Sequence, residues 1–442
     1  MSLEVRRLDA RSADFESALG RLLAWEDDVD AGVTEAVAEI VAAVRHSGDA
    51  ALLDFSVRFD GVAAQTVDAL RIDPAEMETA FLGLAQADRD ALNFAAERIR
   101  SYHQHQLEQG ADGFEFTDAL GNRLGQRIAP IQRVGVYVPG GQAAYPSTVL
   151  MTVLPARVAG VEQVVMTVPT PGGVRSPLVL AAAHIAGVDQ AFAVGGAQAI
   201  AALAYGTASV PRVDKIVGPG GAFVAAAKRQ VFGAVGIDVI AGPSEVLIVA
   251  DGTAPADWMA LDLFSQAEHD AAAQALLISP DAQYLDAVAA AMERLLPQLE
   301  RAEIIRQSIA ARGALIKADG LQECLELANR IAPEHLELAV EHPERWLEQV
   351  KNAGAIFLGA RSPEVMGDYN AGPSHVLPTF GTARFSSPLG VYDFVKRSSV
   401  IGLSEAGSQH LARSAALLAH GEGLDAHAGA AEARLEGFDH NR

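Results

Sequence analysis

The chain has 442 residues, half of them hydrophobic and a fifth charged, a composition typical of a globular protein with two or three domains. Lys and Arg number 34 against 56 Asp and Glu, and the formal net charge of −22 argues against a nucleic-acid partner, which requires clustered basic residues. Cys324 is the only cysteine, so the sequence excludes an intrachain disulfide and a cysteine-rich metal site. A single cysteine also fits a reducing compartment.

No segment of the sequence is typical of export or membrane insertion. Residues 1–24 carry many charges and lack the apolar centre of a signal peptide. The uncharged stretches 134–156 and 190–211 approach the length of a membrane span, but several glycines or prolines interrupt each of them. We therefore expect a cytoplasmic protein with no membrane partner, in which these stretches form buried strands and helices.

The middle of the chain alternates between β-rich runs and helix-compatible stretches. The runs are residues 134–138, 163–168, 191–194 and 215–217, and a loop rich in glycine or proline follows each of them. This alternation is typical of βαβ units and a parallel sheet. In such sheets, ligands bind where the loops follow the carboxyl ends of the strands.

The alternation resumes after Gly242 and Pro243. Further strands are predicted at residues 246–249, 275–278, 314–317 and 355–358, with helices between them. The regions before residue 130 and after Ser404 have mainly helical patterns. The sequence therefore predicts an α/β fold with two Rossmann-like parallel-sheet domains and helical additions at the N- and C-terminal ends.

We expect four parts in this arrangement. They are a helical arm at residues 1–29, a discontinuous first α/β domain at 30–133 and 244–389, a second α/β domain at 134–243, and a tail at 390–442. No low-complexity segment or long linker indicates a further boundary.

The glycine loops are a weak functional signal by themselves. The strict dinucleotide fingerprint G-x-G-x-x-G and the phosphate-loop pattern are both absent from the sequence. The glycines could serve only to make tight turns. Backbone N–H groups at helix N-termini nevertheless favour anions, so a nucleotide could lie across these loops.

Polar residues that are unusual for a purely structural role give a sharper signal. Gln266 and His269 are three residues apart near the end of a predicted helix, so both could reach one metal ion. A solvated helix end with a lone histidine is the simpler alternative. Asp368 and His375 lie in a loop punctuated by glycine and proline, where functional groups concentrate, although aspartate is also an ordinary turn residue.

Two further pairs lie at element boundaries. Pro333 should end the preceding helix and leave Glu334 and His335 just before an apolar strand, where they could supply a general base and activate water. Glu422 and His427 lie in the C-terminal tail, where a helix cap and an exposed histidine are the structural alternatives.

Taken together and in order, these residues and their flanking segments resemble the histidinol dehydrogenase family. The matching segments are GVYVPGG (135–141), GGAQ (195–198), AGPSE (241–245), SQAEHD (265–270), APEHLEL (332–338) and HVLP (375–378). The resemblance covers nearly the whole chain, from residues 48–52 to residues 422–427. Any one segment could arise by chance, but the ordered set is specific.

The resemblance implies a zinc- and NAD-dependent, four-electron oxidation of L-histidinol to L-histidine through the aldehyde, in the last steps of histidine biosynthesis. It also implies an intertwined homodimer in which the tail contributes to the partner subunit's site. By similarity, Gln266, His269 and Asp368 of one chain bind one zinc ion together with His427 from the second chain. Zinc accepts imidazole nitrogen and carboxylate oxygen as ligands.

The resemblance also assigns the remaining contacts. The substrate-binding positions correspond to Ser244, Gln266, His269, His335, Asp368, His375, Glu422 and His427. Most metal-binding and catalytic residues therefore belong to the first α/β domain. NAD is expected on the second, at Tyr137, Gln198 and Gly221.

The same resemblance makes Glu334 and His335 the catalytic pair. Imidazole has a reference pKa of about 6.5, so His335 is suited to remove the hydroxyl proton as hydride leaves. Glu334 is assigned to the water that hydrates the aldehyde before the second oxidation. Many aldehyde oxidations use a cysteine thiolate instead, but Cys324 lies in a helical segment as an expected core residue, which favours direct hydration.

The sequence departs from the family at two positions. Gly221 stands where asparagine is common, which predicts weaker NAD binding because one neutral hydrogen bond contributes about 0.5–1.5 kcal/mol. Ser374 stands where asparagine commonly precedes the substrate-loop histidine, and its shorter side chain can still donate and accept.

Two other functions stay open. One is a zinc- and NAD-dependent dehydrogenase of another small amino alcohol or diol. The other is a ligand-binding protein without catalysis, which would need neither Glu334 and His335 nor a His427 that crosses between subunits.

Overall fold

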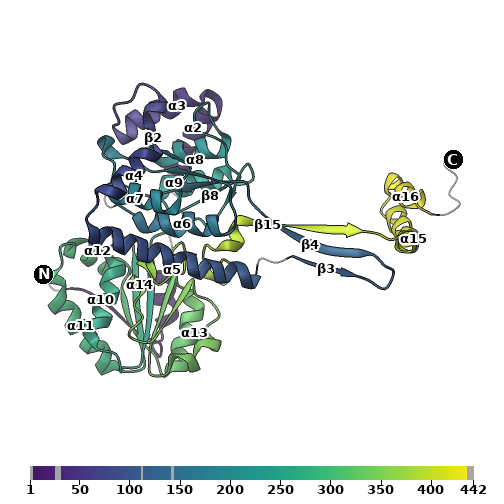
Figure 1. The fold of residues 1–442 in the computed structure, drawn as a ribbon. Coiled ribbons are helices and arrows are strands. Elements are labelled where there is room, and N and C mark those ends of the chain that lie inside the picture. The colour runs from purple at the N-terminus through teal and green to yellow at the C-terminus, as the bar shows by residue number, and fades with distance from the viewer. Residues whose placement is uncertain (1–2, 25–30, 111–112, 141–143, 436–442) are drawn as a thin grey trace. The chain divides into compact units, whose positions relative to one another are not determined.

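The computed structural model describes residues 3–24, 31–110, 113–140 and 144–435 (Figure 1). The chain divides into two compact units, a larger one of Met1–His105 and Ile131–Phe394 and a smaller one of Gln106–Pro130 and Val395–Arg442. No helix within the described ranges is both long enough and apolar enough to cross a membrane. The predicted boundary between residues 29 and 30 lies outside the described residues.

The first sheet of the larger unit has six parallel strands. Their order is β1 (Arg6–Asp9), β12 (Ala314–Lys317), β11 (Gln274–Ser279), β10 (Glu245–Ala250), β13 (His335–Ala339) and β14 (Ala355–Leu358). Strands β10 and β11 are buried along their whole length, as continuous apolar runs in central parallel strands predict.

Helices cover both faces of the first sheet (Figure 1). Val246 and Ile248 of β10 pack into one hydrophobic core, and Leu247 and Val249 pack into another on the opposite face. One face is covered by α10 (Ala256–Ala267), α11 (Ala282–Leu295) and α12 (Ala302–Arg312), and the other by α1 (Phe15–Leu23) and α13 (Leu321–Ile331). The short helix α14 (Glu364–Tyr369) follows β14.

The second sheet of the larger unit also has six strands, and all of them are parallel except β2. Their order is β2 (Arg71–Ile72), β7 (Gln190–Phe192), β6 (Gln163–Thr167), β5 (Arg133–Tyr137), β8 (Lys215–Val217) and β9 (Gly236–Ile237). The accompanying helices are α2 (Ala31–Ser47), α3 (Asp49–Phe55), α4 (Pro74–Gly83), α6 (Pro146–Val158), α7 (Pro177–Ala186), α8 (Gly196–Tyr205) and α9 (Ala222–Val231).

The smaller unit contains a three-stranded antiparallel sheet and two helices. The strands are β15 (Val395–Gly402), β4 (Arg123–Pro130) and β3 (Phe114–Thr117), and the helices are α15 (Glu405–Gly421) and α16 (Asp425–Glu432). The long helix α5 (Gln86–Gly110) begins in the larger unit and ends in the smaller one.

The predicted fold class, an α/β protein with parallel sheets, is confirmed, but the helical interpretation of some segments was wrong. Residues 6–9 form a strand paired with β12 rather than part of a helical arm. Residues 114–117 and 123–130, where we expected helix, form a sheet with residues 395–402, for which we predicted no strand. These strands are exposed or half-buried, and the two long ones, residues 123–130 and 395–402, lack the apolar alternation that indicates a strand.

The N-terminal helices pack with the second sheet. Val44 of α2 and Leu52 of α3 share a hydrophobic core with Phe192 and Ile200, and β2 pairs with β7. The sequence analysis instead grouped residues 30–133 with the strands of the first sheet. Periodicity identifies a helix's apolar face but not the sheet that covers it, which accounts for the difference.

A buried asparagine holds the start of α15 in the smaller unit. The Asn122 Oδ1 atom accepts from the Ser404 backbone N–H at 3.1 Å, and its Nδ2 donates to Asp118 Oδ2 at 2.9 Å. The Ser404 hydroxyl in turn accepts from the Gly407 N–H at 2.9 Å and so caps the helix. A Cβ at Gly407 would lie 1.7 Å from Asn122 Oδ1.

We predict that Gly407→Ala destabilises the smaller unit by about 1–3 kcal/mol, because Asn122 must leave its partners to make room. Thermal unfolding and limited proteolysis of residues 395–435 measure the effect. Gly421→Ala is the matched control, since a Cβ there meets no atom within 4 Å. Equal stability of the two variants would contradict the packing described for Asn122.

Candidate active site

The amino ends of two adjacent strands in the first sheet bring three acid–base groups together. Strand β10 begins at Glu245 and β13 begins at His335, and the register pairs Val246 with His335. Glu334 directly precedes β13. Glu245, Glu334 and His335 are all buried. The group therefore lies at the amino edge of this sheet and not at the carboxyl edge, where parallel sheets usually bind ligands.

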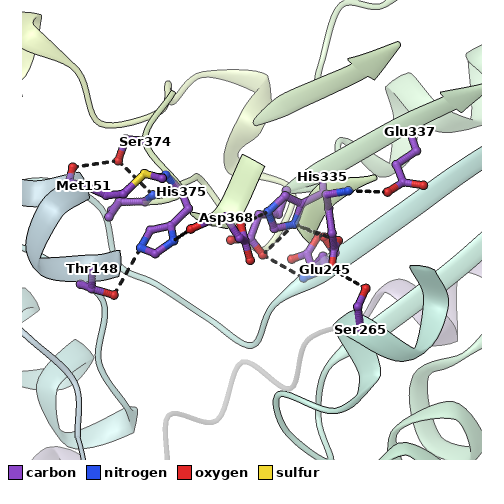
Figure 2. Close-up of polar contacts among 12 residues, drawn as sticks. Thr148, Met151, Glu245, Ser265, His335, Glu337, Asp368, Ser374 and His375 are labelled. Carbon is purple, nitrogen blue, oxygen red and sulfur yellow. Dashed lines mark hydrogen bonds and ion pairs between the residues drawn. The ribbon is translucent and has the colours of Figure 1, made fainter. Parts of the chain in front are cut away.

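The imidazole of His335 is held in a fixed orientation (Figure 2). Its Nδ1 lies 2.9 Å from the backbone oxygen of Glu245. Because a carbonyl oxygen can only accept, Nδ1 carries the proton of that hydrogen bond. The other nitrogen, Nε2, is buried without a hydrogen-bond partner among the described residues and lies 3.5 Å from Asp368 Oδ1.

Three carboxylates surround this ring. The Nδ1 atom of His335 lies 3.8 Å from Glu334 Oε2 and 3.7 Å from Glu364 Oε2. Burial lowers the pKa of His335, but Glu334, Glu364 and Asp368 together raise this pKa well above its ordinary value. The surrounding charge therefore stabilises the imidazolium that forms when the ring takes a proton.

Glu334 has the properties of a group that exchanges protons near neutral pH. Its Oε2 atom accepts from the Glu245 backbone N–H at 2.9 Å. Burial raises the pKa of Glu334 to about 7, although the nearby His335 lowers it. The preceding helix α13 ends at Ile331, and Ala332 then adopts a left-handed conformation with φ of 53°. This turn before Pro333 places Glu334 at the start of β13, as the sequence predicted.

Asp368 lies near the end of α14, at the opposite side of the His335 ring. Burial raises the pKa of Asp368, but the charge of His335, whose Nε2 lies 3.5 Å away, and the nearby His375 and His269 outweigh it, so the pKa is lowered. The Asp368 backbone oxygen lies 3.0 Å from His375 Nδ1, and His375 Nε2 lies 3.2 Å from the Thr148 hydroxyl. Asp368 and His375, predicted from one loop, therefore lie together at this site.

The end of α10 carries the two other predicted metal ligands of this chain, Gln266 and His269. Gln266 is buried, and no described residue forms a hydrogen bond with its Oε1 atom. His269 follows in a turn, with its N–H on the Gln266 backbone oxygen at 3.2 Å, and interacts electrostatically with Asp368 and His335. The Ser265 hydroxyl donates to Glu364 Oε1 at 3.2 Å, which links α10 to α14.

These donors fit a zinc ion. An amide oxygen, an imidazole and an ionised carboxylate are ligands that zinc accepts, and an unpaired buried oxygen such as that of Gln266 costs about 1–3 kcal/mol without a partner. In the described parts of the chain, no three His, Cys, Asp or Glu side chains are grouped for a metal ion. The predicted set takes only His269 and Asp368 of these four types from one chain, and its third member from the same chain, Gln266, is of another type.

The remaining predicted substrate residues have different surroundings. Ser244 directly precedes β10, where its backbone oxygen accepts from Gln274 N–H at 2.9 Å. Ser374 donates to the Met151 backbone oxygen at 3.2 Å and so ties the His375 loop to α6 (Figure 2). Glu422 and His427 lie on the smaller unit, after α15 and within α16, and both are exposed.

The predicted cofactor residues lie at the carboxyl ends of strands in the second sheet. Tyr137 ends β5, and its hydroxyl accepts from the Gly196 N–H, at the start of α8, at 3.2 Å. Gln198 is buried in the first turn of the same helix. Gly221 precedes α9, and a Cβ there would meet no atom within 4 Å. A larger side chain would therefore fit at residue 221.

Sequence reasoning missed the acidic residues that support this site. Glu245, Glu337 and Glu364 are each buried, and Glu337 Oε1 accepts from the Glu364 N–H at 2.7 Å. The signal available in the sequence is a glutamate at or within an apolar strand, since a carboxyl group is seldom buried without a specific partner.

The fold and this site together define an α/β protein with buried acid–base groups at one sheet and glycine loops suited to a nucleotide at the other. The model of one protein family, described as histidinol dehydrogenase, matches residues 24–435. The histidinol dehydrogenases of Cupriavidus pinatubonensis and Pseudomonas putida are both 57% identical to the chain, over 98% of each sequence. The crystal structure of histidinol dehydrogenase from Elizabethkingia anophelis is 31% identical, with a TM-score of 0.89 over 97% of this chain and 98% of that one.

The chain therefore belongs to the histidinol dehydrogenase family, as the sequence motifs predicted. Proteins of this family are NAD-dependent oxidoreductases, so the binding-protein alternative is dropped.

A pair of neighbouring carboxyl groups beside the site, one buried (Glu337) and one half-buried (Asp262), gives stability a defined pH dependence. Burial and the nearby Asp262 raise the pKa of Glu337 to about 8, and burial raises the pKa of Asp262 to about 7. The folded protein therefore keeps protons that the unfolded chain releases near its ordinary carboxyl pKa. This contribution to stability is complete below about pH 4 and is lost as pH rises through about 7–8.

We predict that the melting temperature of the wild-type protein falls between about pH 6 and about pH 8.5, and that Glu337→Gln reduces this slope. Glutamine keeps an acceptor for the Glu364 N–H and cannot ionise. Each proton that the folded protein holds and the unfolded chain releases changes the free energy of unfolding by about 1.4 kcal/mol per pH unit. Glu326→Gln, at an exposed position of α13, is the control and should leave the slope unchanged. An unaltered slope in Glu337→Gln would show that Glu337 is ionised in the folded protein.

Proposed function

We propose that this chain is a cytoplasmic L-histidinol dehydrogenase that oxidises L-histidinol to L-histidine through L-histidinaldehyde with two NAD, in the last steps of histidine biosynthesis. Membership of the family supports the overall activity. The observation that carries the assignment of residues is the buried His335 ring, with Nδ1 on the Glu245 backbone oxygen and an unpaired Nε2 beside Asp368.

In the first oxidation, His335 acts as the general base. Its Nε2 accepts the proton of the substrate's hydroxyl group. At the same time a hydride leaves the carbon that carries this hydroxyl group and is transferred to NAD, so the alcohol becomes the aldehyde. The positive charge that develops on the ring is offset by Glu334, Glu364 and Asp368. A positioned base of this kind contributes roughly 10²–10⁴-fold to the rate.

In the second oxidation, Glu334 activates a water molecule that adds to the aldehyde and forms a hydrate. His335, once it has released its first proton, takes a hydrate proton as the second hydride leaves, and the carboxylic acid so formed loses its remaining proton to give the carboxylate. Cys324 is not a suitable nucleophile for a thioester route, because it lies on the buried face of α13 and its side chain packs in the core. Burial raises the pKa of Cys324 to about 12, so the thiolate is scarce at neutral pH.

The metal ligands proposed are Gln266, His269 and Asp368 of one chain with His427 of a second. A bound zinc ion would orient the polar groups of the substrate and, by its charge, oppose protonation of His335. Ser244, His375 and Glu422 complete the substrate contacts, and the Glu422 carboxylate offsets the substrate's ammonium group.

A homodimer is part of the proposal because His427 and Glu422 would serve the partner subunit's site. Large apolar side chains on the smaller unit support a protein partner, since exposed apolar patches of this kind mark interfaces. They are Phe114, Phe116, Ile401, Leu417 and Leu418, each more than half exposed. On the second sheet, Tyr137, Gln198 and the backbone at Gly221 are proposed to bind NAD.

Counting reduced cofactor tests the reaction directly. We predict two NADH formed per L-histidinol consumed, because the alcohol and then the hydrate each lose one hydride. His335→Asn should lower kcat by roughly 10²–10⁴-fold with its zinc content unchanged. His46→Asn, on the surface of α2, is the control. A yield of one NADH per substrate would contradict the four-electron reaction, and zinc loss in His335→Asn would contradict the role of this residue.

Mixing two inactive variants tests the shared site. We predict that His335→Asn and His427→Asn subunits, once exchanged, recover about a quarter of the wild-type activity, because half of the dimers are mixed and each has one intact site. His427→Asn alone should also contain less zinc by elemental analysis. No recovery after verified subunit exchange would mean that both histidines act in the same chain.

A further inference from the structure

The loop between β8 and α9 lies directly against Tyr137. Gly218 follows β8 with φ of +112°, and a Cβ at this position would lie 2.1 Å from the Tyr137 backbone oxygen. No side chain could therefore be accommodated at residue 218. The backbone of this loop and that of Tyr137 are packed together, so the position of one fixes the position of the other.

Two buried charged residues hold the Gly218 peptide from both sides. Asp238 Oδ2 accepts from the Gly218 N–H at 2.7 Å, and Lys228 Nζ donates to the Gly218 backbone oxygen at 3.0 Å. Lys228 also forms an ion pair with Asp238 Oδ1. Both side chains are only 2% exposed. These hydrogen bonds to its N–H and to its carbonyl oxygen hold the Gly218 backbone in one position.

The buried ion pair between Lys228 and Asp238 is expected to add little to the stability of the folded protein. Buried ion pairs lose much of their attraction to desolvation, and apolar residues of similar volume often stabilise a protein as well or better. Lys228 comes from the second turn of α9, and Asp238 follows β9, so two elements converge on one glycine peptide. The contacts favour a role in fixing geometry.

The geometry that they fix belongs to the proposed NAD site. Tyr137 binds the Gly196 N–H, and the Gly218 loop leads to the first N–H groups of α9. Backbone N–H groups at a helix start are suited to an anionic ligand. Because residue 221 is glycine, the loop has no side chain there to contact the cofactor, so its contribution depends on where the backbone lies.

We propose that Lys228 and Asp238 are positioning residues for NAD, which act by fixing the Gly218 loop against Tyr137. This inference rests on the proposed function, because it requires NAD to bind at these loops. The hydrogen bonds of these two side chains go to the Gly218 backbone and to each other, which is the pattern of a positioning role.

The same strand offers a matched control at its other end. Lys215, the first residue of β8, pairs with Asp393 at 2.9 Å and donates to the Asp393 backbone oxygen at 2.8 Å. This pair also joins a lysine, an aspartate and a carbonyl oxygen, but it lies at the amino edge of the sheet, away from the glycine loops. Lys215→Met should therefore reduce stability without changing NAD affinity.

The test compares Lys228→Met, Asp238→Asn and the double variant with Lys215→Met. NADH binding is measured by fluorescence titration, and KM for NAD, KM for L-histidinol and kcat are measured by steady-state kinetics. The double variant leaves no unpaired buried charge, so it keeps the test available if Lys228→Met alone does not fold. Melting temperatures are recorded for every variant.

We expect the Kd for NADH and the KM for NAD to rise roughly tenfold or more in the loop variants, as loss of a charged hydrogen bond implies. The KM for L-histidinol, kcat and zinc content should stay within about twofold of wild type. NADH affinity within twofold of wild type in a folded loop variant would overturn the positioning role and leave the proposed function intact. A wild-type protein that binds no NADH would overturn both.

Discussion

The hydrogen bond between His335 Nδ1 and the Glu245 backbone oxygen determines how the rest of the site is used. It fixes the ring, assigns the proton to Nδ1 and directs Nε2 towards Asp368. The bond depends on the register of two parallel strands, in which Val246 pairs with His335. Because this geometry comes from sheet pairing and not from a flexible loop, the His335 ring proposed to be catalytic is set in place as the core folds.

The two sheets supply different chemistry from opposite edges. The first sheet carries acid–base groups at the amino ends of β10 and β13, and the second carries glycine loops at the carboxyl ends of β5, β7 and β8. Hydrogen bonds between Thr148 and His375 and between Ser374 and the Met151 backbone oxygen join the His375 loop to α6, beside the second sheet. They connect the proton-accepting and the proposed hydride-accepting parts of the larger unit.

Sequence patterns were sufficient where local signals were strong. Strands such as 246–249 and 275–278 are continuous apolar runs, and Pro333 marked the element boundary at which Glu334 and His335 lie. The pairing of residues 123–130 with 395–402 joins segments far apart in sequence with little apolar alternation, so no local pattern indicated it. The roles of Glu364 and of the Lys228–Asp238 pair likewise depend on burial, which arises only from tertiary packing.

The most direct test of the account is a crystal structure of the zinc-loaded protein with L-histidinol, with anomalous data collected at the zinc edge. The account predicts one zinc peak bound by Gln266, His269 and Asp368 of one chain and His427 of the other. It also predicts the substrate hydroxyl at about 2.6–3.2 Å from His335 Nε2, with Nδ1 still on Glu245. A zinc peak elsewhere, or a hydroxyl out of reach of His335, would contradict it.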